Sequence, residues 1–563
     1  MQSSRQAHAQ AGLKRTLSIR HLVMLSLGGS IGTGLFLASG APVSQAGPSG
    51  ALLAYALIGV MVYFLMTALA ELSAFEPVSG SFAVYGEKYV DKGFGLAMGI
   101  NYSYNWAIAV AVDLVAAQII MQYWFADVPG WIWSALFLGV MFCINFFSAK
   151  SFGEAEFWFA SVKVCAVVAF IITGFMLAVG VLPGHDAVGL KNWNLNGDGS
   201  FVGGFTAFLG VAMVVGYSFQ GTELVGVAAG ESKDPDRTIP AAIRTIFWRI
   251  ILFYVLSIVV IGLLIPHNDP RLLENDLADI ALSPFTLVFE NAGFPWAAAL
   301  MNVVVLTTVL SAGNSGMYAA TRLVHTLAQE GRLPSTFAKV SASGVPRNAL
   351  YAVTILSALC FLTTFLQTQS VYVWLLNTTG MGGFMCWLGI GLSHWRFRRG
   401  MQKQGYDLNL LPYRSPVFPL GTLYAFAVCL VVALGQNTEA VFNGDWLGVL
   451  DGGGIGCVLK PSFGFIIGFL VAAVVTGYIV EHLKERTFWK LFFAALAGTV
   501  IIYVIGTVYF YFITRLYLNT YPGFMKMMSA CVFTTFPKDA VFCLLLAFIA
   551  KRVYPAIRKY ITC

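Results

Sequence analysis

Long apolar runs constrain the fold of this chain more than any other feature of its sequence. Stretches of about 20 residues with few charges recur along nearly the whole length, and each matches a helix that crosses a bilayer. Hydrophobic residues make up 58% of the 563 residues and charged residues 11%. Soluble domains carry about 25% charged residues. We therefore expect an all-α polytopic membrane protein embedded in the lipid bilayer.

The apolar runs predict about fourteen transmembrane helices. We place them at about 22–44, 50–74, 95–124, 130–148, 155–182, 203–229, 246–266, 287–328, 348–366, 370–395, 417–438, 463–480, 491–514 and 524–550. Residues 1–21 are polar and basic, and the run that follows them has no A-x-A cleavage pattern. We expect a cytoplasmic N-terminal segment and a retained first helix.

Basic residues fall between alternate apolar runs, so they share one side of the membrane. Lys14 precedes the first run, and Lys559 follows the last one. Arg237, Arg244 and Arg249 are assigned to the connection between the sixth and seventh helices. This pattern predicts that both termini are cytoplasmic. The net charge of +7 then reflects orientation in the membrane, and we expect no nucleic-acid partner.

Glycines interrupt the first apolar run, where residues 26–36 read SLGGSIGTGLF. Non-helical backbone at membrane depth survives only where it is buried or lines a cavity. Transporters use such broken helices to direct free backbone N–H groups at an anionic substrate group. The alternative is close helix packing through small residues, because Gly28 and Gly32 have the required spacing of four. This stretch alone leaves both interpretations open.

A second interrupted run favours the transporter interpretation. Residues 216–231 read GYSFQGTELVGVAAGE and contain two carboxylates, Glu223 and Glu231. An acid within a membrane is costly, so it is a functional hypothesis by default. Glu231 has an interfacial alternative, because Lys233 follows it closely. The two broken helices, the first and the sixth, hold corresponding positions in two five-helix repeats, which predicts a site near the membrane centre.

Further polar residues lie inside the apolar runs. Lys163 is either a lysine that reaches the membrane surface with its long stem or a buried amine that gains and loses a proton. For Asp113 we favour a structural role as partner of a backbone or hydroxyl donor. Tyr102, Tyr217 and Phe219 are assigned to helix packing rather than to a gate.

Residues 12–440, about three quarters of the chain, resemble the bacterial lysine-specific permeases. These belong to the amino acid transporter branch of the amino acid–polyamine–organocation superfamily. The matching blocks include RHLVMLSLGGSIGTGLFLASG, ELSAFEPVSGSFAVYG, FGEAEFWFASVKV, VGYSFQGTELVGVAAGES, VLSAGNSGMYAATR and WLLNTTGMGGFMCWLGI. The resemblance implies an inverted five-plus-five helix repeat with broken helices 1 and 6. It also implies import of L-lysine across the bacterial cytoplasmic membrane, with the proton as coupling ion and no other cofactor.

The resemblance also implies residue roles. The substrate carboxylate would be held by Ser30, Gly32, Thr33 and Gly34. The α-ammonium would meet carbonyls of the unwound sixth helix, at Ser218, Phe219, Gly221 and Thr222, while Tyr102 and Tyr217 would contact or gate the substrate. Glu223 would recognise the cationic substrate or take part in proton coupling. Lys163 would be the proton-linked switch, and Ser311, Asn314 and Ser315 would face it and the first helix. Glu231 is kept as a further candidate for proton coupling.

The C-terminal part departs from that family. A Gly-rich stretch at 441–462 is interpreted as a junction between a permease domain at 22–440 and a segment at 463–563. That segment resembles the C-terminal half of the membrane S component of biotin uptake systems. The match to Asp539 would imply a biotin contact, but Phe542 replaces the usual lysine and the first three helices of that component are missing. We expect no biotin transport, and a gene fusion, a recombination product and an assembly error remain alternative origins.

Two other functions remain open at this stage. The chain could bind lysine and signal to a regulatory membrane protein instead of transporting it. A permease for arginine, ornithine or histidine is a second alternative. The sequence contains no nucleophile–base pair, phosphate loop or Cys/His cluster, so we expect neither an enzyme nor a metal site.

Overall fold

A computed structural model describes most of the chain. It covers residues 17–28, 31–36, 39–122, 124–182, 186–194, 200–269, 272, 283–366, 368–434, 463–483 and 487–516, with isolated positions between 523 and 548. The predicted junction at 441–462 and Ser30 lie outside the described residues. The chain divides into two compact units, Met1–Ala433 and Leu434–Cys563.

The described residues are helical, and their only β-structure is an isolated bridge between Leu17 and Ser232. Eight helices are long and apolar enough to cross a membrane: Gly40–Phe75, Lys92–Gln122, Gly130–Phe147, Lys150–Val179, Arg237–Leu264, Ala299–Gln329, Arg347–Thr364 and Phe488–Arg515. These spans confirm an α-helical membrane protein, while the total of about fourteen helices stays a prediction.

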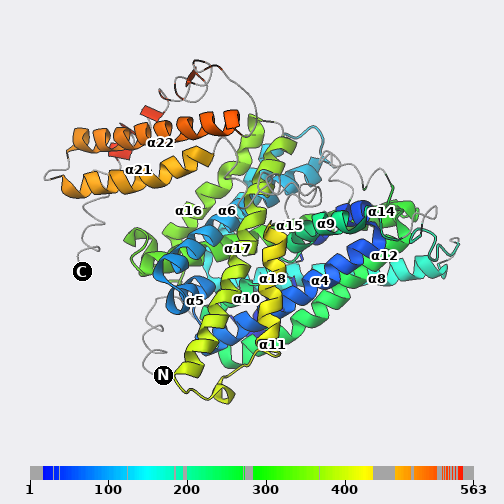
Figure 1. The fold of residues 1–563 in the computed structure, drawn as a ribbon. Helices are drawn as coiled ribbons and strands as arrows, with labels where there is room; N and C mark the ends of the chain where they lie inside the picture. Colours follow the sequence, from blue (N-terminus) through cyan, green and yellow to red (C-terminus); the bar gives the residue numbers. More distant parts are fainter. Residues whose placement is uncertain are drawn as a thin grey trace. The chain divides into compact units, whose positions relative to one another are not determined.

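The first unit contains most of the helices. In chain order they are α2 (Ile19–Gly28), α3 (Thr33–Phe36), α4 (Gly40–Phe75), α5 (Ser81–Tyr89), α6 (Lys92–Gln122), α7 (Gly130–Phe147), α8 (Ala149–Val179), α9 (Gly204–Ser218), α10 (Leu224–Ala228), α11 (Pro235–Arg249), α12 (Leu256–Leu264), α14 (Pro284–Asn291), α15 (Pro295–Gln329), α16 (Arg347–Ser357), α17 (Thr368–Lys403) and α18 (Leu420–Leu434). Helix α6 is packed between α15 and α17 in the interior of this unit (Figure 1). Because 94% of the most apolar stretch of α6 is buried, α6 is a core helix with little contact to lipid.

Both glycine-rich stretches break their helices. The first predicted span divides into α2 and α3, and α4 already begins at Gly40. The sixth span divides into α9 and α10, with turns at 219–223 between them. Gly221 has φ +95°, a conformation that side-chain-bearing residues rarely adopt, so glycine allows the chain to turn there.

The seventh helix differs from the expectation. It begins at Pro235 and runs through α11, a π-helical turn at Ile250–Val255 and α12. Arg237, Arg244 and Arg249 therefore lie within this helix and not in a connection before it. Arg249 is fully buried, which corrects its assignment as an orientation signal. A single apolar run could not reveal this, because α11 is amphipathic and only α12 is continuously apolar.

The second unit contains two long helices, α21 (Phe463–His482) and α22 (Phe488–Leu516), which lie side by side (Figure 1). Gly468 faces the backbone of Ile502 so closely that a Cβ on Gly468 would lie 2.9 Å from the Cα of Ile502. Glycine thus permits the close approach of the two helices that is typical of membrane proteins.

Candidate substrate site between two broken helices

The two broken helices touch where each is interrupted. The hydroxyl of Ser218, the last residue of α9, donates a hydrogen bond to the carbonyl of Gly34 in α3 at 2.8 Å. A Cβ on Gly34 would lie 2.4 Å from the Cα of Ser218, so only glycine fits. From the other side, the Tyr254 hydroxyl donates to the Ser218 carbonyl at 3.0 Å, and the Tyr55 hydroxyl lies 3.2 Å from the Ser218 hydroxyl. The break in one helix is therefore held against the break in the other.

A small cavity of about 30 Å³ lies beside this contact. Its lining comes from both breaks and from the core helices: Gly32, Thr33, Gly34, Trp106, Ala109, Asp113, Tyr217, Ser218, Gln220 and Ala312. The Tyr217 and Thr33 hydroxyls approach to 3.4 Å across it. A cavity of this volume holds one or two water molecules. The cavity must therefore enlarge to admit an amino acid.

Asp113 is the acid that lines this cavity, and it is 3% exposed. The sequence favours a structural role for it, as partner of a backbone or hydroxyl donor, and that role stays a prediction. Its position at the cavity also makes it a candidate contact for a cationic ligand. The sequence places Asp113 within a helix but carries no signal for the side of the helix on which it lies.

Glu223 lies behind the break in the sixth helix and does not line the cavity. Its carboxylate accepts hydrogen bonds from the Tyr102 hydroxyl at 2.7 Å, the Trp387 indole at 3.1 Å and the Gly221 amide at 3.3 Å. Of the three residues assigned to packing, Tyr102 and Phe219 are fully buried, while Tyr217 lines the cavity. Tyr102 packs edge-on against Phe82, and Phe219 stacks on Tyr254 with ring centroids 4.2 Å apart. Glu223 and Tyr102 thus form one hydrogen-bonded network beside the site.

Lys163 is fully buried in α8, which excludes the alternative that its amine reaches the membrane surface. Its Nζ lies 4.0 Å from a carboxylate oxygen of Glu156, two turns away on the same helix. Both Glu156 oxygens accept from the Ser311 hydroxyl of α15 at 2.8 Å. Glu156 was missed in the sequence because it stands near the start of its apolar run, beside the half-buried Glu154, and resembles an interfacial acid.

The neighbouring residues of α15 are buried as well. The side-chain oxygen of Asn314 accepts from the Asn145 amide of α7 at 2.8 Å, and Ser315 is 0% exposed. Ser311 therefore contacts Lys163's partner Glu156, while Asn314 joins α15 to α7.

Arg249, which the sequence assigns to a connection between helices, is a second residue whose place beside the site the sequence did not reveal. Its guanidinium donates to the Ser26 carbonyl near the end of α2 and to the Thr222 hydroxyl at 2.9 Å. It therefore connects the two broken helices from α11. The sequence contained one signal, an arginine next to an apolar run, and that signal is typical of a helix end.

Glu231 lies away from the cavity. Its carboxylate accepts from Arg322 at 2.7 Å and from the Tyr318 hydroxyl at 2.9 Å, and all three side chains are buried. Its backbone carbonyl also accepts from the Leu17 amide at 3.1 Å. The geometry is that of a clamp between the end of the sixth helix, α15 and the N-terminal segment.

In the second unit, the Tyr503 hydroxyl donates to the carboxylate of Asp539. This contact places Asp539 against α22. Among the described residues, no group of three or more His, Cys, Asp or Glu side chains could hold a metal ion.

Membrane-spanning helices, two of them broken and joined beside a small cavity lined by an acid, define a helical membrane transporter. Residues 21–450 match the amino acid permease family, and the chain belongs to that family. It is a transporter of amino acids rather than an enzyme. Residues 421–559 match the BioY family, which agrees with the resemblance of the C-terminal part to biotin uptake components.

Curated relatives share most of the first unit. The chain is 61% identical to the lysine-specific permease LysP of Escherichia coli over 440 residues, which is 78% of this chain and 90% of the relative. It is 48% identical to the LysP of Lactococcus lactis over 453 residues, 79% of this chain and 88% of the relative. The histidine permease HisP of the same species is 47% identical over 437 residues, 78% of this chain and 91% of the relative.

Proposed function

We propose that the chain imports L-lysine together with protons across the bacterial cytoplasmic membrane by alternating access. The observation that carries this proposal is the contact between Gly34 and Ser218, which joins both broken helices at a cavity lined by an acid. The two relatives named as lysine-specific permeases support lysine as the substrate. Because one relative is named a histidine permease, histidine is the second candidate.

In this proposal the substrate is held by its three charged groups. Free backbone N–H groups between Gly32 and Gly34 receive the carboxylate, and carbonyls of residues 218–222 receive the α-ammonium. Asp113 lines the cavity and offers a carboxylate to the side-chain ammonium. A charge-assisted hydrogen bond of this kind is shorter and stronger than one between neutral groups. Glu223 supports the site indirectly, through its bonds to Tyr102 and the Gly221 amide.

Lys163 and Glu156 form the proposed proton-coupling pair. Their charged atoms are 4.0 Å apart in a fully buried setting, where a change in either charge alters the stability of the arrangement. Ser311 connects this pair to α15. Binding or loss of one proton would therefore change how tightly α8 holds α15, and this is the differential contact that alternating access requires.

The remaining architecture follows the same proposal. The first unit is an inverted five-plus-five helix repeat with further helices, and both termini are cytoplasmic. The segment at 463–563 is an accompanying half-module that takes no part in lysine transport. Glu231 acts in the clamp with Arg322 rather than in proton transfer.

The test is equilibrium binding of labelled L-lysine to the purified full chain, with arginine, ornithine, histidine and leucine as competitors. Lysine should compete best. Asp113→Asn should weaken lysine binding by about 10- to 150-fold, the effect of about 1.5–3 kcal/mol for a hydrogen bond to a charged group. Asp127→Asn, a change of an exposed acid outside the helices, is the matched control and should bind as the wild type does. Stronger competition by histidine, or unchanged binding by Asp113→Asn, would contradict the proposal.

A further inference from the structure

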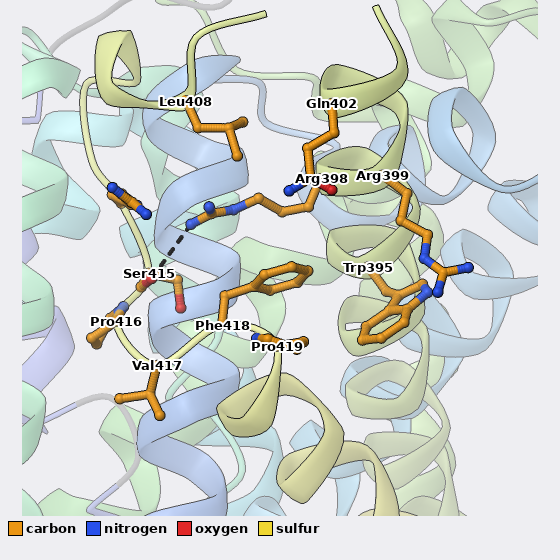
Figure 2. Close-up of a pocket in the computed structure, with 11 residues that line it drawn as sticks. Trp395, Arg398, Arg399, Gln402, Leu408, Ser415, Pro416, Val417, Phe418 and Pro419 are labelled. Atoms are coloured by element: carbon orange, nitrogen blue, oxygen red, sulfur yellow. Dashed lines mark hydrogen bonds between the residues drawn. The ribbon is translucent and has the colours of Figure 1, made fainter. Parts of the chain in front are cut away.

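A basic cavity of about 590 Å³ lies at the end of α17, apart from the substrate site. One wall is the last turns of α17, which contribute Trp395, Arg398, Arg399 and Gln402, and the other is the segment that leads to α18 (Figure 2). That segment contributes Leu408, Arg414, Ser415, Pro416, Val417, Phe418 and Pro419. Three of the residues that line the cavity are arginines, and the lining contains no acidic residue.

One of the three arginine charges is already compensated. Arg398 donates to the buried carboxylate of Glu71 at 2.5 Å and to the Ser415 carbonyl at 3.4 Å, and the Ser415 amide donates to Glu71 at 2.6 Å. Figure 2 shows the Arg398 side chain extended across the cavity toward Ser415, above the ring of Phe418. This ion pair fixes one wall of the cavity against α4.

The other two guanidinium groups are exposed and have neutral partners. Arg399 lies 4.8 Å from the ring centroid of Trp395, and Arg414 donates to the side-chain oxygen of Asn409 at 2.9 Å. Neither contact neutralises a charge. The cavity therefore presents two positive charges that can form charge-assisted bonds with phosphate oxygens.

The rim of the cavity is apolar where it adjoins α18. Val417 and Leu420 are 57% and 69% exposed. Val417 has φ +57°, a backbone conformation that β-branched residues rarely adopt, and it keeps its side chain on the surface. Trp395 also lines the cavity, on the α17 wall, and aromatic residues are enriched at the interface between lipid and water. Charges beside an exposed apolar surface match the headgroup and the acyl chains of one molecule.

We propose that this cavity binds the headgroup of an anionic phospholipid. The phosphate would lie between Arg399 and Arg414, and the acyl chains would follow Val417 and Leu420 along α18. Basic pockets between membrane helices on the cytoplasmic side are a recognised form of lipid binding. The proposal uses the orientation given above, in which the end of α17 is cytoplasmic, but it is independent of the substrate and of proton coupling.

The test is native mass spectrometry of the full chain titrated with phosphatidylglycerol, cardiolipin or phosphatidylcholine. The variant Arg399→Gln/Arg414→Gln removes both exposed charges and leaves the Arg398–Glu71 pair intact. We expect anionic lipids to bind more tightly than phosphatidylcholine and to lose about thirtyfold in affinity in this variant, since each basic residue near an anionic lipid contributes about fivefold. The control is Arg396→Gln, which changes an exposed arginine of α17 outside the cavity and should leave lipid binding as in the wild type.

Two results would overturn the proposal. The first is equal binding of anionic lipid by the double variant and the wild type. The second is displacement of bound lipid by an equal concentration of glycerol phosphate, which would assign the cavity to a soluble phosphate compound. Retained lysine binding by the double variant shows that it has folded, so a loss of lipid can be attributed to the cavity.

Discussion

Replacing Gly34 by alanine should separate the two broken helices. The new Cβ would lie 2.4 Å from the Cα of Ser218, and ordinary contact begins near 3.4 Å, so α3 and α9 must move apart by about 1 Å. The Ser218 hydroxyl would then lose its bond to the Gly34 carbonyl, now 2.8 Å long. Overpacking of this kind costs about 1–3 kcal/mol, which corresponds to about 5- to 150-fold weaker substrate binding.

The assay is equilibrium binding of labelled L-lysine to purified Gly34→Ala. The matched control is Gly139→Ala in α7, where a Cβ meets no atom within 4 Å. Both variants replace a glycine by alanine within a helix, and only Gly34→Ala affects the contact between the two broken helices. If Gly34→Ala and Gly139→Ala bind lysine with the same affinity, the reasoning that places the site at this contact is refuted.

Three further predictions concern residues that the structure pairs. Glu156→Gln should keep lysine exchange across proteoliposomes but reduce proton-driven accumulation at least tenfold, because it removes the charge 4.0 Å from Lys163; unchanged accumulation would contradict this. Arg249→Ala should lower the free energy of unfolding by about 3 kcal/mol or more, because it removes two buried hydrogen bonds from a charged donor. Thermal unfolding measures this loss, and Arg237→Ala, at an exposed position of the same helix, is the control. Burial and the nearby Glu87 raise the pKa of Glu330 to about 7, so the folded protein should lose stability as the pH rises from about 4.5 to 7. The melting temperature of Glu330→Gln should vary less over this pH range than that of the wild type. A variant whose melting temperature follows the same pH profile as the wild type would contradict this prediction.

The sequence predicted the features that depend on local pattern. Apolar runs identified the membrane helices, and clustered glycines identified both breaks, because few other residues tolerate such backbone at membrane depth. Gly34 and Gly221 lie where that pattern placed them, and the former meets Ser218 across the breaks. These predictions need no knowledge of how distant segments meet.

The residues that the sequence missed depend on distant contacts. Glu156 gains its interest from Ser311, which is 155 positions away, and Arg249 from Ser26, which is 223 positions away. Asp113 and Glu223 both lie within apolar runs, but only the packing of α6 and α9 shows that Asp113 lines the cavity while Glu223 lies behind it. One sequence records which residues share a helix and leaves open which neighbour each side chain faces.

Accumulation of labelled L-lysine in proteoliposomes, with and without an inward proton gradient, tests the central claim most directly. We predict that the purified full chain concentrates lysine inside the vesicles only while the gradient lasts, and that excess unlabelled lysine blocks this uptake while biotin does not. Accumulation that is unchanged when the gradient is collapsed would contradict proton coupling. Lysine binding without any uptake would contradict transport itself.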